Sequence, residues 1–246
     1  MKSSHDIDEL LNQWPFDPFA INVRLLESRQ RQILQMRVDM GVLQMETQGR
    51  PDGMTPHGAE TYFDYLKRQV LEADVFELDE QNCLEIDREF VQFYHRRVCW
   101  LQLKEFSKAV ADADHTLGLM DFCKEFSKDD EWTHNHEQYR PFVIYHRTQA
   151  AALSWIEGEG DPDTEHAIEE VNKGLEVLRL LFVDYDAEDQ YEQDELVVRL
   201  IEFREGVRER FEIGLTLKEQ LAEAIEKEDY EAAAQLRDQL GKKGLE

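Results

Sequence analysis

Apolar side chains recur at intervals of three and four residues along most of this chain, the spacing that brings them onto one face of an α-helix. Convincing alternation of apolar and polar residues, the pattern of a half-buried β-strand, is found nowhere in the sequence. The pattern therefore predicts an all-α fold. The helices are expected at residues 17–46, 59–74, 79–104, 106–126, 131–157, 163–182 and 196–211, with a closing pair between 217 and 240.

The residues before the first expected helix form an N-terminal arm in this interpretation. The apolar run Trp14, Pro15 and Phe16 would hold the arm against the body. The long helix that follows is expected to begin at Asp17 and Pro18, because proline suits the first position of a helix.

Glycine and proline are densest in GRPDGMTPHG, residues 49–58, which marks a loop. We interpret RPDG as a tight turn with proline at its second position. Arg50, Asp52 and His57 form a candidate polar site here, since functional side chains are often held on loops. A turn that only orients two helices is the alternative that we favour.

An internal repeat runs through the middle of the chain. The triplet Tyr-His-Arg occurs at 94–96 and again at 145–147, and the alanine-rich segment from Ala109 has a counterpart from Ala167. Each unit would contain two helices. The architecture resembles tetratricopeptide repeats (TPR), most closely in EFSKAVADADHTLGL, but the units exceed the about 34 residues of that family and lack its Trp and Gly signature, so we describe them as TPR-like.

The repeated triplet has a candidate function as a peptide groove. Helical stacks of this kind bind acidic or C-terminal peptide tails through basic positions. The alternative, which we favour, is that the basic side chains pair with carboxylates inside the stack. The candidate groove residues are His95, Arg96, Arg97, His146 and Arg147.

The closing segment LKEQLAEAIEKEDYEAAAQLRDQL, residues 217–240, contains two short amphipathic helices joined by a charged run at 226–229. Thr216 with Glu219 forms a capping-box signature, and Asp229 is a suitable N-cap for the second helix. Isolated helices of this length are marginal in water, so the pair must pack against something.

The run from Glu228 to Asp238 resembles the UVR motif, which is shared by the bacterial excision-repair proteins UvrB and UvrC and by some regulators of Clp proteases and arginine kinases. It departs from the usual pattern at Tyr230, where Phe is common, and at Ala232, where Lys is common, and both changes keep the apolar stripe. The resemblance, which covers about a tenth of the chain, implies a helical hairpin that docks against another hairpin or a protein partner. The contact residues expected on it are Leu221, Ile225, Tyr230, Ala233, Arg237 and Leu240.

The chain of 246 residues carries a formal charge of −26, and 41% of its residues are hydrophobic. It is thus apolar enough for a folded core, and its acidity would repel the phosphate backbone of nucleic acid over most of the surface. The arginines between residues 18 and 58 leave nucleic-acid binding by that segment as an alternative. No apolar run approaches about 18 residues, the N-terminus lacks an apolar signal region, and the three cysteines have no C-x-x-C spacing, so we expect a cytoplasmic protein without membrane contact.

The strongest candidate for catalysis is a metal site formed by His134, His136 and Glu137 near His146, because two histidines and a carboxylate can hold zinc. Its spacing is unfavourable, since a helical pair of zinc ligands needs i, i+4 and H-x-H suits a strand. The sequence also lacks a phosphate-binding loop and the G-x-S-x-G of serine hydrolases. We therefore expect no catalytic residues and no cofactor.

These patterns divide the chain into an N-terminal arm at residues 1–16, a TPR-like body at 17–212 and a UVR hairpin at 216–241. The expected function is a non-enzymatic adaptor or regulatory subunit whose hairpin docks another UVR hairpin or a second copy of the chain. The resemblance points to excision repair, Clp proteolysis or arginine-kinase control without choosing among them. The alternatives are a metal-dependent enzyme and a nucleic-acid-associated repair accessory.

Overall fold

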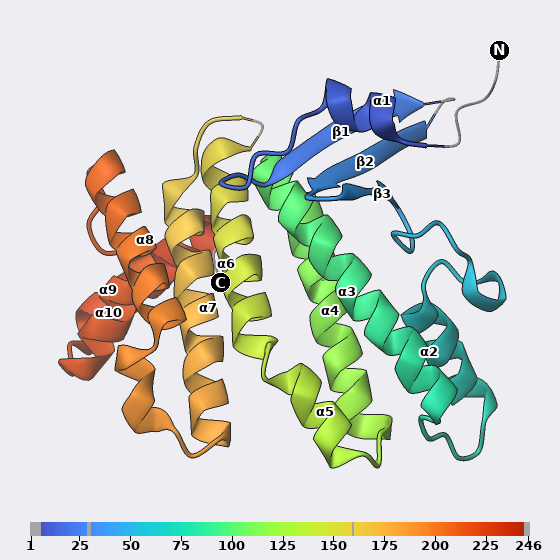
Figure 1. The fold of residues 1–246 in the computed structure, drawn as a ribbon. Helices are drawn as coiled ribbons and strands as arrows, with labels where there is room; N and C mark the ends of the chain where they lie inside the picture. The colour runs from blue at the N-terminus through green and yellow to red at the C-terminus, as the bar shows by residue number, and fades with distance from the viewer. Residues whose placement is uncertain (1–5, 29–30, 159, 244–246) are drawn as a thin grey trace. The chain divides into compact units, whose positions relative to one another are not determined.

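The computed structural model describes residues 6–28, 31–158 and 160–243. The chain divides into two compact units, residues 1–147 and 148–246. Helices make up 67% of the described residues, so the predicted helical fold class is confirmed, with a small sheet added near the N-terminus (Figure 1). In chain order the elements are α1 (Asp8–Gln13), β1 (Asn22–Ser28), β2 (Arg31–Val38), β3 (Gly41–Glu46), a 3-10 turn (Pro56–Gly58), α2 (Tyr62–Glu72), α3 (Glu80–Gln102), α4 (Phe106–Phe126), α5 (Asp130–Glu137), α6 (Arg140–Glu157), α7 (Thr164–Asp184), a second 3-10 turn (Glu188–Gln193), α8 (Glu195–Phe211), α9 (Leu217–Glu226) and α10 (Tyr230–Lys243).

The prediction of one long helix at residues 17–46 is wrong. This segment forms an antiparallel sheet in the order β1-β2-β3 (Figure 1). Leu34, at the centre of β2, is fully buried and lies opposite Leu25 on β1 and Met45 on β3. Cross-strand rows of apolar side chains are the unit of sheet stabilisation, and this row decides the structure of the segment.

The strand pattern is hard to recognise in the sequence because a polar residue occupies a buried position. Its hydrogen-bond partners lie on the neighbouring strands. Gln35 is buried in β2, where its side chain accepts a hydrogen bond from Nε of Arg24 at 2.9 Å and donates one to Gln44 at 2.9 Å. Met40, which a helix would place on the apolar face with Ile33, lies instead in the turn between β2 and β3 and is 88% exposed.

Aromatic side chains hold the N-terminal arm on this sheet. The guanidinium of Arg24 lies 4.1 Å from the centre of the Trp14 ring, and that of Arg37 lies 5.7 Å from the centre of the Phe16 ring. Arg37 also donates from Nε to the carbonyl oxygen of Trp14 at 3.1 Å. Cation–π contacts of this kind attach the arm through the residues that the sequence indicated.

Helices α2, α3 and α4 pack around an apolar core in the first unit (Figure 1). The N-cap residues Thr61 and Asp79 accept hydrogen bonds from the amides three residues later, and these caps fix where α2 and α3 begin. The predicted helix bounds agree to within a few residues for all three. The buried side chains of the core are Tyr62, Leu66, Leu78, Ile86, Leu119, Phe122 and Cys123.

The prediction of one helix at residues 131–157 is wrong, because the segment forms two helices, α5 and α6. Pro141, in the first turn of α6, supplies the reason. Proline has no amide hydrogen to donate, and its ring would clash with the carbonyl of Glu137, four residues earlier, if the helix continued.

In the second unit, α6 and α7 approach closely at one point. A Cβ placed on Gly174 of α7 would lie 2.1 Å from Oγ1 of Thr148 on α6, so only glycine allows this approach. Helix α8 packs against α7, and the buried side chains on these two helices include Leu178, Val197 and Leu200.

Helices α9 and α10 form the closing hairpin, as predicted (Figure 1). The capping box between Thr216 and Glu219 is present, and Asp229 caps α10 by accepting from the amide of Ala232 at 3.0 Å. Glu228, in the connection, has a φ of 56°, which lets the chain reverse direction there.

Candidate functional site

The closing hairpin is fastened to the second unit at its N-terminal end. Thr216 donates a hydrogen bond from its hydroxyl to the carboxylate of Glu169, and the amide of Leu217 donates to Glu165 at 3.2 Å. Both acceptors lie on α7. The first turn of α9 therefore has polar attachments to the helix that precedes it by about 50 residues in the chain.

Glu219 is the centre of this attachment. Its carboxylate accepts from the backbone amide of Thr216 at 2.8 Å, from Asn172 of α7 at 3.0 Å, and from Arg208 of α8. Burial alone raises the pKa of Glu219, but the hydrogen bonds from Thr216 and Asn172 and the charge of Arg208 outweigh it and lower the pKa below its usual range. The group is thus held ionised and joins three helices.

The opposite end of the hairpin, near its turn, carries exposed apolar side chains. Ile225, in the last turn of α9, has 51% of its surface exposed, and Tyr230, the first residue of α10, has 71% exposed. Arg237 is also exposed and follows Tyr230 by two helical turns, so it lies on the same side of α10. These three members of the predicted contact set are accessible to a partner.

The remaining members of that set lie inside. Ala233 and Leu240 are buried, and Leu221 is half-buried. A partner that leaves the hairpin closed reaches Ile225, Tyr230 and Arg237 directly, and the role of the full set in docking stays a prediction.

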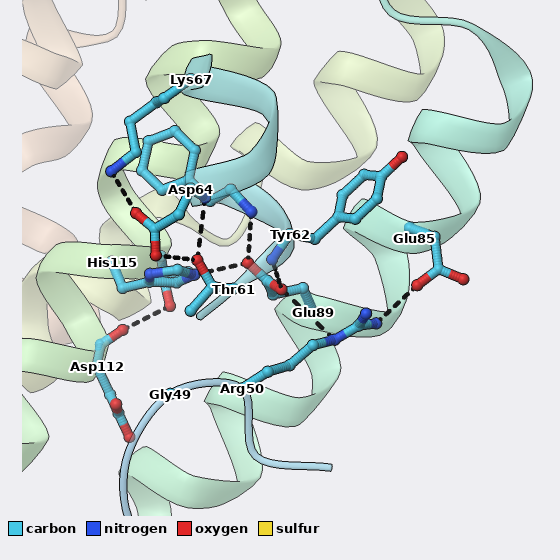
Figure 2. A network of polar contacts seen from close by, with 12 residues as sticks. Gly49, Arg50, Thr61, Tyr62, Asp64, Lys67, Glu85, Glu89, Asp112 and His115 are labelled. Carbon is cyan, nitrogen blue, oxygen red and sulfur yellow. Dashed lines mark hydrogen bonds and ion pairs between the residues drawn. The ribbon is translucent and has the colours of Figure 1, made fainter. Parts of the chain in front are cut away.

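The loop at residues 49–58 brings Arg50 and Asp52 together, with Nε of Arg50 at 3.5 Å from Asp52. Arg50 is buried, and its Nη2 donates to Glu85 of α3 at 2.8 Å (Figure 2). His57 lies apart from them, because its ring stacks on Tyr65 at 4.2 Å. The structure therefore assembles two of the three residues predicted for this loop.

Glu89 of α3 is a member of this polar network that sequence reasoning missed. The carboxylate is fully buried and accepts hydrogen bonds from the amides of Tyr62 at 2.7 Å and Phe63 at 3.0 Å, in the first turn of α2 (Figure 2). His115 of α4 lies 2.9 Å away, and Nε of Arg50 lies at 3.5 Å. A signal was present, since Glu89 occupies the same helix face as the core residue Ile86.

The five basic residues predicted for a peptide groove lie in different surroundings. Arg96 is buried and paired with Asp112 at 2.7 Å, and its Nη1 donates to the carbonyl of Gly49 at 2.8 Å, so it holds the loop. Arg147 pairs with Asp114. The Arg96 contact is of the internal kind that the sequence left as the alternative, whereas the Arg147 pair lies at the surface. Peptide binding stays a prediction.

The remaining three groove residues, His95, Arg97 and His146, all belong to the first unit. Burial lowers the pKa of His95, and burial together with the charge of Arg97 lowers the pKa of His146 to about 4. Both imidazoles are therefore neutral at pH 7. Arg97 is almost fully buried, and its surroundings are treated below.

Two of the residues predicted for a metal site, His136 and Glu137, are engaged in other contacts. Glu137 pairs with Arg140 at 2.7 Å, and the ring of His136 contacts Asp87 through Nε2 at 3.0 Å and the carbonyl of Trp132 through Nδ1 at 2.9 Å. His134 is exposed. Within residues 6–28, 31–158 and 160–243, no group of three or more His, Cys, Asp or Glu side chains is arranged to hold a metal ion.

Comparison with known proteins assigns the closing hairpin to a class. The family model of the UvrB/uvrC motif, UVR, matches residues 215–243, which are the connection before α9 and the two helices of the hairpin. In UvrB and UvrC this motif serves protein or DNA interactions. No curated protein and no solved structure matches the chain. Among the described residues, no helix is both long enough and apolar enough to cross a membrane.

Proposed function

We propose that this chain is a non-enzymatic adaptor or regulatory subunit that docks a protein partner through the turn end of its UVR hairpin. The observation that carries the proposal is the exposure of Ile225 and Tyr230 on either side of the turn. The partner surface is a second helical hairpin, either that of another UVR protein or that of a second copy of this chain.

One end of the hairpin is fixed to the second unit, and the other end carries the exposed apolar side chains. Thr216 and Glu219 fasten the start of α9 to α7 and α8, whereas Ile225 and Tyr230 lie at the turn. A fastened hairpin holds these side chains in a defined position, which reduces the entropy lost on binding. Burying one large apolar side chain contributes about 1.5–3 kcal/mol, so the two form a small docking centre.

Charge favours a protein over nucleic acid as the partner. The formal charge of the chain is −26, and the connection at 226–229 carries three carboxylates and one lysine. Such a surface repels phosphates and favours a partner whose rim around the apolar contact is basic. A cytoplasmic location and a link to excision repair, Clp proteolysis or arginine-kinase control belong to this proposal through the UVR resemblance.

The test is affinity capture from the native host with the full-length chain and with the double variant Ile225→Ala, Tyr230→Ala. Both side chains are exposed, so the variant should keep its helicity and lose the captured UVR partner by at least about tenfold, which corresponds to about 1.4 kcal/mol. Leu71→Ala with Val75→Ala is the matched control, since both of these side chains are 87% exposed and lie in the first unit. The same partner at the same yield with the hairpin variant would overturn the proposal.

A further inference from the structure

An apolar pocket of about 610 Å³ lies in the first unit and is lined by residues of α3, α4, α5 and the start of α6. Its volume falls within the range of about 300–1,000 Å³ that is typical of small-molecule sites. Side chains from α3 (Phe90), α4 (Met120) and α6 (Phe142 and Val143) supply apolar walls. None of the residues that line it belongs to the hairpin.

A single arginine lies in the wall of this pocket. Arg97 of α3 is 2% exposed, and its Nη1 donates to Oγ1 of Thr116 at 3.0 Å. Its Nε is buried without a hydrogen-bond partner in the part of the chain that the structure describes. The guanidinium therefore has donor capacity left over inside an apolar site.

No carboxylate within residues 6–28, 31–158 and 160–243 forms an ion pair with Arg97. The acidic residue whose charge acts on it, Asp112, is held by the neighbouring Arg96 at 2.7 Å. Asp87, which also lines the pocket, has its Oδ1 occupied by Trp132 and His136, both at 3.0 Å. The nearby carboxylates thus serve other groups.

Burial of a cation without a counter-charge costs several kcal/mol in a protein. Burial lowers the pKa of Arg97 to about 10, although the charge of Asp112 acts in the opposite direction. The side chain still carries its proton at pH 7, because its pKa remains above that pH. His146 is neutral at pH 7 and therefore cannot balance the charge of Arg97. A persistent positive charge in an apolar pocket points to an anionic ligand that neutralises it.

We propose that this pocket binds a small amphipathic organic anion, a carboxylate on an aliphatic or aromatic body, with its carboxylate on Arg97 and its body against Phe90, Met120 and Phe142. A planar guanidinium matches a carboxylate with two parallel hydrogen bonds. Thr116 orients the guanidinium, because its hydroxyl accepts from Arg97 and also donates to the carbonyl of Asp112 at 2.8 Å.

The test uses decanoate and decanol, which share a ten-carbon body and differ in charge. Isothermal titration of the full-length wild-type chain, below the concentration at which decanoate forms micelles, should show decanoate bound at least about tenfold more tightly than decanol. This comparison needs no variant. Failure of decanoate to bind at about 1 mM, or equal affinity for the two compounds, would overturn the proposal.

The variant Arg97→Met keeps the length of the side chain and removes its charge. It should weaken decanoate binding by about tenfold or more and leave decanol binding unchanged or stronger. Arg179→Met, at an arginine that pairs with Glu176 on the surface of the second unit, is the matched control and should bind both compounds as the wild type does. An unchanged preference for decanoate in Arg97→Met would show that the arginine has only a structural role.

A second variant keeps the test independent of the folding of Arg97→Met. Val91 lines the pocket and is exposed, so Val91→Trp should narrow the entrance without disturbing the core. It should lose binding of decanoate and of decanol together. Retention of decanoate binding in Val91→Trp would place the ligand outside this pocket and contradict the proposal.

Discussion

Adjacent arginines on α3 show how the position of a side chain, and not its type, decides its role. Arg96 is buried with Asp112 as its ion-pair partner and with the loop carbonyl of Gly49 as a further acceptor. Arg97 is buried as deeply and has the Thr116 hydroxyl as its acceptor. The charge of Arg96 is neutralised by Asp112, so its role is structural. The charge of Arg97 has no ion-pair partner among the described residues and is available to an anionic ligand.

Glu89 of α3 connects three helices, because its carboxylate contacts both α2 and α4. Its carboxylate receives the first amides of α2, where the positive end of the helix dipole favours a negative charge, and it also contacts His115. Glu89→Gln replaces one acceptor oxygen by an NH₂ donor, so an amide of α2 loses its partner. We expect the free energy of unfolding of the first unit to fall by about 2–4 kcal/mol.

Urea denaturation followed by circular dichroism measures this change. Glu125→Gln, on the exposed side of α4, removes the same charge from a solvated position and should stay within about 0.5 kcal/mol of the wild type. Equal midpoints for the two variants would show that Glu89 does not hold the three helices together.

At the scale of elements, the sequence predicted the helices well where local signals and packing agree. Helix α4 was expected at its observed bounds, and the caps Thr216 and Asp229 located both helices of the hairpin. The caps are local, so a single sequence contains them. The match of residues 215–243 to the UVR model rests on the same short segment.

The sheet was missed because its stability is not local. Gln35 looks like an interruption of any strand until Arg24 and Gln44 are seen beside it. The candidate pocket was missed for the same reason, since Phe90, Met120 and Phe142 come from three helices that no sequence spacing connects. Arg97 was noted in the sequence as basic, but its lack of a counter-charge is a property of the folded chain alone.

The close approach of α6 and α7 makes a prediction about packing. In Gly174→Ala the new Cβ would lie 2.1 Å from Oγ1 of Thr148, so the helices must separate or Thr148 must move. We expect a loss of about 1–3 kcal/mol in the free energy of unfolding of the second unit, measured by thermal or urea denaturation. Gly206→Ala on α8 meets nothing within 4 Å and is the matched control, expected to be neutral or to stabilise the chain.

The double variant Gly174→Ala, Thr148→Ala separates packing from helix propensity. Removing the hydroxyl and methyl of Thr148 opens the space that the new Cβ needs, so the double variant should recover part of the lost stability. If Gly174→Ala alone were as stable as the wild type, the two helices would not pack as closely in solution as they do here.

For the whole molecule, charge decides how two copies can meet. Each copy carries −26, and the hairpin turn adds carboxylates next to Ile225 and Tyr230, so a symmetric contact brings like charges together. Salt screens this repulsion, since the Debye length falls from about 14 Å at 50 mM to about 4 Å at 500 mM by the scaling from about 10 Å at 0.1 M. Apolar contacts are not weakened by the same change. Self-association through the hairpin should therefore increase with salt, whereas binding of a basic partner should decrease.

Sedimentation velocity of the full-length chain at about 50 mM and about 500 mM NaCl measures this difference. We expect a monomer at the lower salt concentration and a growing dimer fraction at the higher one. Ile225→Ala with Tyr230→Ala should abolish the increase, because the screened charges remain but the apolar contact is gone, whereas Leu71→Ala with Val75→Ala should keep it. A dimer that forms equally in both double variants would place the contact away from the UVR hairpin. If the chain stays monomeric at both salt concentrations, self-association through the hairpin is contradicted. The partner that covers Ile225 and Tyr230 would then be a UVR hairpin on another protein.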